Sequence, residues 1–104
     1  MQGMMKQVQK MQAEMEKVRK ELENKVVTEE SGGGMVKATA NGKKGLVSIE
    51  IDSEIIESGD KEMIEDLIVA AVNKALDAAG RMAEEEMGNV TKGMIPPGMN
   101  IPGF

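Results

Sequence analysis

The chain has 104 residues and a hydrophobic fraction of 40%, so a single small domain is the expected organisation. It contains neither cysteine nor histidine, which excludes disulfides, thiolate nucleophiles and the commonest general base near neutral pH. Eleven methionines and one aromatic residue, Phe104, leave few large rigid side chains for a core. Because small domains with weak cores are often stabilised by association, we expect a homodimer.

The net charge of −5 is unevenly distributed along the chain. Residues 1–25 carry six cations and four anions, whereas the remaining residues carry seven cations and fourteen anions. This asymmetry indicates a charged partner for the first segment, although the acidic total counts against a nucleic acid. No apolar run has the length of a membrane span or the pattern of a signal peptide, so we expect a cytoplasmic protein without a membrane partner.

Residues 3–24 are predicted to form a helix. Its apolar residues are spaced alternately by four and three positions, as in a coiled-coil seam: Met4, Val8, Met11, Met15, Val18 and Leu22. The seam predicts packing on another helix or on a sheet of the same chain. A second stripe lies opposite the seam and consists of Lys6, Lys10, Lys17 and Lys20. These lysines form either a phosphate-binding surface or a solvated outer face, and their spacing is compatible with both.

A three-stranded antiparallel sheet is predicted after this helix. Small apolar residues alternate with polar ones in segments 35–40 and 46–51, which is typical of strands with one buried face. The connecting segment begins with an Asn-Gly pair, which tolerates positive φ and predicts a β-hairpin. Segment 25–30 is the predicted third strand. The glycines Gly32–Gly34 that follow it predict a tight reversal, because a phosphate-binding loop would need a helix behind it.

A short helix containing Ile55 and Ile56, capped by Asp52 or Ser53, is expected after the hairpin. Asp60 is the predicted N-cap of a long last helix that ends near Met87. Gly80 inside this helix predicts a bend or a close contact. Residues 1–88 then form the predicted domain, and residues 89–104, rich in glycine and proline, a flexible tail.

The middle of the last helix, residues 67–72, is apolar on all sides and requires cover on more than one side. The sheet can cover one side, and a second subunit is the expected cover for the other. The candidates for the dimer interface are apolar residues of the hairpin and of this helix: Val36, Ala38, Val47, Ile49, Leu67, Ile68 and Val72.

The sequence predicts no catalytic residue, metal site, cofactor or small-molecule substrate. Its carboxylate pairs lack metal-loop spacing, and it contains no dinucleotide-binding or Walker motif. Two functions remain. One is a dimeric nucleic-acid binder that presents the lysines of helix 3–24 to phosphates. The other is a protein-interaction or scaffolding dimer whose Met-rich helices dock a partner, and whose binding would respond far less to salt.

Four stretches of the chain follow one another in an order that matches a known family. They are the opening MKQVQKMQAEMEKVRKELENK, the glycine turn into GGGMVKATANGKKGLVSIEID, the later EDLIVAAVNKAL, and the ending GMNIPGF, residues 98–104. With these features the chain resembles the YbaB/EbfC family of small bacterial nucleoid-associated proteins. The resemblance implies an α+β homodimer with joined sheets, whose terminal helices project like the arms of tweezers.

The resemblance also implies a function in the nucleoid, where such proteins bind double-stranded DNA and organise it or regulate gene expression. Their projecting helices hold the duplex. The matching candidates in this chain are cations of the first helix, Lys6, Lys10, Lys17, Arg19 and Lys20. Cations of the last helix, Lys74 and Arg81, are secondary candidates because acidic residues lie near them in the sequence.

Overall fold

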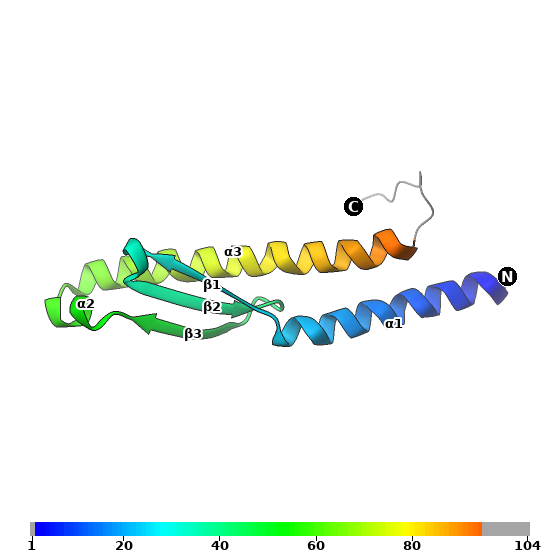
Figure 1. Cartoon of the computed structure of the whole chain (residues 1–104), viewed down its shortest axis with the longest axis horizontal. Helices are drawn as coiled ribbons and strands as arrows, with labels where there is room; N and C mark the ends of the chain where they lie inside the picture. Colours follow the sequence, from blue (N-terminus) through cyan, green and yellow to red (C-terminus); the bar gives the residue numbers. More distant parts are fainter. Residues whose placement is uncertain (1, 95–104) are drawn as a thin grey trace.

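The computed structural model describes residues 2–94, which form an elongated α+β structure (Figure 1). Its elements in chain order are α1 (Gln2–Asn24), β1 (Val26–Ser31), the 3₁₀ turn η1 (Gly32–Gly34), β2 (Val36–Asn41), β3 (Leu46–Ile51), α2 (Ser53–Ser58) and α3 (Lys61–Met94). The predicted fold class and the predicted order of elements are confirmed. The third predicted strand is also present and begins one residue later than expected, at Val26.

The sheet is antiparallel, with the order β1-β2-β3 and β2 in the centre. Val36 at the start of β2 lies opposite Ser31 of β1 and Ile51 of β3. An irregularity between Thr39 and Ala40 shifts the register toward the hairpin turn. Because side chains alternate along a strand, the apolar residues of β2 all point to one face of the sheet.

Helix α3 covers this face and forms the core with β2 (Figure 1). The core is made of small residues that are fully buried: Val36, Ala38, Ala40, Ala71, Ala75 and Ala79. The three alanines of α3 recur every four positions and therefore lie in one stripe along the helix. Small side chains on both elements allow the helix to approach the sheet closely, so this core forms without large aromatic residues.

The C-terminal part of α1 packs against the rest of the protein, whereas its first turns project from it. Val18 and Leu22 are buried, but Met4 and Val8 of the same seam are exposed. The N–H of Gly42 donates to the carbonyl oxygen of Leu22 at 2.8 Å. A Cβ at Gly42 would lie 2.6 Å from Leu22 Cδ2 and 2.8 Å from Leu22 O, so the turn and the helix are in tight contact.

The two predicted reversals are present, with one difference in their backbone conformation. Gly32, Gly33 and Gly34 have φ values of 61°, 67° and 94°, which confirms the tight glycine turn. In the β2–β3 turn, positive φ occurs at Lys44 (61°) and not at the expected Asn-Gly pair. Asn41 still organises this turn, because its side-chain oxygen accepts hydrogen bonds from two backbone N–H groups of the turn at 2.9 Å each.

Both predicted N-caps are confirmed. The carboxylate of Asp52 accepts a hydrogen bond from the N–H of Glu54 at 2.8 Å at the start of α2. The carboxylate of Asp60 accepts one from the N–H of Met63 at 3.1 Å at the start of α3. These bonds satisfy backbone donors that have no partner inside the helix.

The prediction that the last helix ends near Met87 is wrong, because α3 continues to Met94. Gly88 lies inside the helix, where it costs only about 1 kcal/mol relative to alanine. Proline is the residue that forces a chain out of a helix, and the first proline after Met87 is Pro96. The rest of the predicted tail, residues 95–104, lies outside the described residues.

The molecule measures 67 × 23 × 15 Å, with α2 at one end and the first turns of α1 at the other (Figure 1). Helix α3 passes the β2–β3 turn at Gly80. A Cβ at Gly80 would lie 2.8 Å from Lys44 Cε, so the glycine marks a close contact with this lysine side chain.

Candidate nucleic-acid interface

The lysine stripe of α1 is exposed along its whole length. Lys6, Lys10, Lys17 and Lys20 are all exposed, while the opposite side of the same helix carries the buried Val18 and Leu22. Burial of the seam against the sheet and α3 therefore orients the stripe toward solvent. No ion pair joins these four lysines to another residue in the part of the chain that the structure describes. Their charges are available to an external anion.

The other candidate cations differ from these lysines in their contacts. Arg19 is exposed beside the stripe and forms an ion pair with Glu16 at 3.9 Å, within one turn of α1. The Lys74 ammonium donates to the backbone oxygen of Glu30 at 3.2 Å, near the end of β1 that is farther from α1. Arg81 is exposed two turns further along α3. The structure therefore does not bring Lys74 to the stripe of α1.

The β2–β3 turn brings two further cations to the base of α1. Gly42 binds the backbone of Leu22, so the adjacent Lys43 and Lys44 lie beside the last turn of α1. The Lys43 ammonium donates to the carboxylate of Glu23, and this hydrogen bond holds the pKa of Glu23 below its ordinary value. The sequence pattern predicted only a turn in this segment. The signal for a basic contribution was its Lys-Lys pair, flanked by glycines.

A second ion pair joins the base of α1 to α3. The Lys25 ammonium donates to the Glu86 carboxylate at 2.6 Å, and this hydrogen bond raises the pKa of Lys25. Lys25 is thus already paired within the protomer. The unpaired positive charge of this region is concentrated on the outer face of α1.

Eight of the eighteen acidic residues lie near the opposite end of the molecule. Residues 50–66 carry eight carboxylates and one lysine, and all eight carboxylates are exposed. They belong to the end of β3, to α2 and to the start of α3, far from the first turns of α1 (Figure 1). Over such distances, charges are screened by physiological salt, whose Debye length is about 8 Å. These eight carboxylates therefore do not oppose binding of an anion to the first turns of α1.

The candidates for the dimer interface fall into two groups. Val36 and Ala38 are fully buried in the protomer core and have no surface to offer a second subunit. Val47 and Ile49 are exposed on β3, and Leu67, Ile68 and Val72 are half-buried on α3.

An open apolar face remains beside the core. Ile49 lies opposite Ala38, so it belongs to the face of the sheet that α3 covers. It is nevertheless exposed, because α3 packs mainly over β1 and β2. The half-buried residues of α3 that continue the row are Ile64, Ile68, Val72 and Leu76. We call this surface of β3 and α3 the open apolar face.

The described residues contain neither a group of metal-ligating side chains nor a membrane-spanning helix. No group of three or more acidic side chains within residues 2–94 is arranged to hold a metal ion. None of the helices in this range is both long enough and apolar enough to cross a membrane.

Comparison with known proteins identifies the family. The YbaB/EbfC DNA-binding family matches residues 1–94. A nucleoid-associated protein of Chlorobium luteolum is 53% identical over 94 residues, which cover 90% of this chain and 84% of the relative. A nucleoid-associated protein of Alkaliphilus metalliredigens is 50% identical over 99 residues, which cover 95% of this chain and 87% of the relative.

A solved structure shows the same fold. The crystal structure of the uncharacterized protein HP0035 from Helicobacter pylori matches with a TM-score of 0.62 at 30% identity, over 85% of this chain and 98% of that one. The resemblance seen in the sequence is thereby confirmed. The chain belongs to the YbaB/EbfC DNA-binding family.

Proposed function

We propose that this protein associates with the nucleoid and binds double-stranded DNA as a homodimer, mainly through contacts of the α1 lysines with phosphates. The observation that carries the proposal is the separation of charge along the molecule. Four exposed lysines of α1 form no ion pair among the described residues, and eight of the eighteen acidic residues lie at the α2 end. Two relatives are named nucleoid-associated proteins, and this supports DNA as the partner.

The spacing of the lysines favours phosphates over base edges. From Lys6 to Lys20 the stripe extends over about 21 Å of helix. Double-stranded DNA carries one negative charge per ~1.7 Å of its axis, so such a stripe meets phosphates at any sequence. Lysine is a flexible point charge that lacks the planar fork with which arginine reads guanine. We therefore expect strong salt dependence and weak sequence preference.

The open apolar face supports the homodimer. The protomer leaves Val47 and Ile49 in water next to a half-buried row on α3. Contiguous exposed apolar surface of this kind marks an interaction site on a soluble protein. Strand β3 has one neighbour in the sheet of the described residues, so its other edge can also pair. A second copy offers the same surface, and the resulting dimer would carry two α1 arms for one duplex.

The site assignment is tested by two double variants that each remove two lysines. Lys10→Gln/Lys17→Gln changes the α1 stripe. Lys37→Gln/Lys61→Gln changes two lysines on β2 and at the start of α3 and serves as the matched control. Fluorescence anisotropy with a labelled duplex at low salt measures the affinity.

We expect the α1 variant to bind at least about tenfold more weakly, because lost phosphate contacts reduce counterion release. The control variant should bind within about twofold of the wild type. Equal affinities of the two variants would contradict a DNA site on α1. Retention of a protein partner at high salt, together with no binding of DNA at low salt, would instead favour the scaffolding function.

A further inference from the structure

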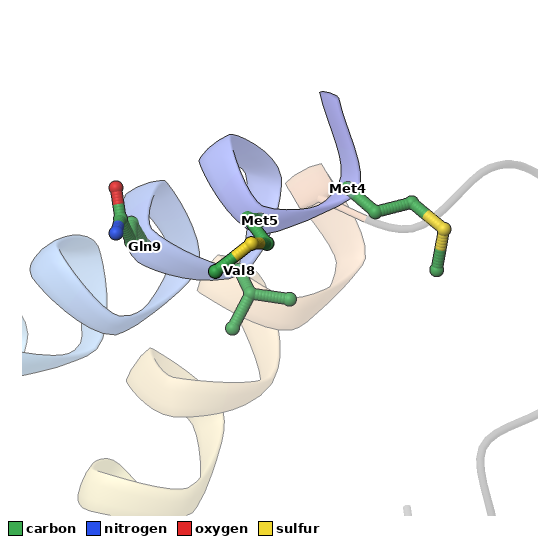
Figure 2. A pocket seen from close by; sticks show the side chains of 4 residues that line it. All are labelled: Met4, Met5, Val8 and Gln9. Atoms are coloured by element: carbon green, nitrogen blue, oxygen red, sulfur yellow. The ribbon is translucent and has the colours of Figure 1, made fainter. Parts of the chain in front are cut away.

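The free end of α1 carries an open apolar hollow lined by Met4, Met5, Val8 and Gln9 (Figure 2). Met4 and Met5 are 71% and 65% exposed. Met4 and Val8 belong to the same seam as the buried Val18 and Leu22, so the seam is covered at the base of α1 and bare at its free end. Contiguous exposed apolar side chains of this kind are typical of a docking surface.

We propose that the hollow is covered by residues 95–104 of the same chain. These residues continue from α3, whose last turn lies at the same end of the molecule as the first turns of α1 (Figure 1). Ten residues can span about 33 Å when extended. The hollow, between residues 4 and 9 of α1, extends over only about 8 Å of helix.

The composition of the segment fits this surface. The sequence IPPGMNIPGF contains no ionisable side chain and carries four large apolar ones, Ile95, Met99, Ile101 and Phe104. Its three prolines restrict the backbone before docking, which lowers the entropy that docking costs. Methionines that line the hollow can adapt to an irregular apolar ligand.

Attachment to α3 favours this segment over an external partner. A short tether gives its ligand an effective concentration in the millimolar range, so weak apolar contacts suffice for docking. Docking on the seam side leaves Lys6 and Lys10 on the opposite side exposed. The inference therefore does not rest on the proposed DNA binding, and its test uses no DNA.

The test uses Phe104→Trp in the full chain, because the chain contains no Trp and no Tyr. We expect the emission of this single Trp to be shifted to shorter wavelength and protected from iodide. Met4→Glu/Met5→Glu, added to this chain, should return both properties to those of a solvent-exposed Trp. The matched control is Ile56→Glu/Val69→Glu, which places two carboxylates at sites 55% and 59% exposed outside the hollow, and should change neither.

Three results would overturn the inference. One is solvent-like emission of Trp at position 104 in the otherwise unchanged chain. Another is a blue shift that persists in Met4→Glu/Met5→Glu, since the segment would then dock elsewhere. The third is recovery of the blue shift when the Phe104→Trp/Met4→Glu/Met5→Glu chain is mixed with excess wild type, because the segment would then dock on a second copy. Circular dichroism checks that each variant is folded.

Discussion

Gly42 and Gly80 lie where two segments meet, but a methyl group would meet different obstacles at the two positions. At Gly42 it would collide with the Leu22 side chain and with the Leu22 backbone oxygen, which cannot move without displacing α1. At Gly80 it would meet the end of the Lys44 side chain, which can rotate away. We predict that Gly42→Ala lowers the free energy of unfolding by about 1–3 kcal/mol. Gly80→Ala should stay within about 1 kcal/mol of the wild type.

Urea unfolding followed by circular dichroism measures both changes. Equal losses at the two glycines would contradict the tight contact between the β2–β3 turn and α1.

The ion pair of Lys43 with Glu23 gives a second prediction at this scale. The hydrogen bond from Lys43 lowers the pKa of Glu23 below its ordinary value of 4.5. Because this pKa is lower in the folded protein than in the unfolded chain, ionised Glu23 stabilises the folded state at pH values above the pKa of the unfolded chain. This contribution is lost as the pH falls through the pKa of Glu23 in the folded protein. Glu23→Gln should therefore lower the melting temperature slightly at pH 7 and have no effect at pH values below the lowered pKa.

Thermal melts at a series of pH values between neutral and acidic test this dependence. Glu14→Gln, an exposed site in the same helix, is the control and should show no difference at any pH. A Glu23→Gln deficit that persisted in strong acid would contradict the role of the charge.

Among the elements, the end of α3 is the feature that the sequence pattern predicted wrongly. Glycine and proline are dense after Met87, but Gly88 and Gly93 precede the first proline, and the structure keeps both in the helix. A Cβ at Gly88 would meet no atom within 4 Å. Gly88→Ala should therefore stabilise the last turns of α3 by up to about 1 kcal/mol and slow amide exchange of residues 89–92. Unchanged or faster exchange would show that the chain leaves the helix before this point.

Local signals were sufficient to predict most of the elements. Period-two alternation located the strands, and the carboxylates of Asp52 and Asp60 located two helix starts. The heptad spacing of α1 also separated its lysine stripe from its seam. The contact of Gly42 with Leu22 could not be predicted, because it joins segments twenty residues apart and depends on how α1 leaves the sheet. The lysines of the β2–β3 turn were missed for the same reason.

For the whole molecule, the open apolar face predicts the state of association. Val47→Glu/Ile49→Glu places two carboxylates in this face and should convert the dimer to a folded monomer, since burying unpaired charge is costly. Ile56→Glu, an exposed site on α2 outside this face, is the control and should leave the dimer intact. Sedimentation equilibrium measures the mass. A wild type with the mass of one chain, or a dimer in both variants, would contradict an interface at β3.

The separation of charge is the other feature of the whole molecule. Exposed lysines lie along α1, and eight carboxylates lie within residues 50–66 near the opposite end of a structure 67 Å long. A protein that is acidic in total can therefore present a basic surface to a polyanion, because salt screens the distant carboxylates.

The most direct test of this account is the salt dependence of binding to double-stranded DNA. The wild type is compared with Lys6→Gln/Lys10→Gln/Lys17→Gln/Lys20→Gln by anisotropy over a series of salt concentrations. Each lost phosphate contact should reduce the slope of log K against log salt by about 0.9. We predict weaker binding and a slope shallower by several units for the variant. Identical affinities and slopes for the two proteins would contradict binding of phosphates by α1.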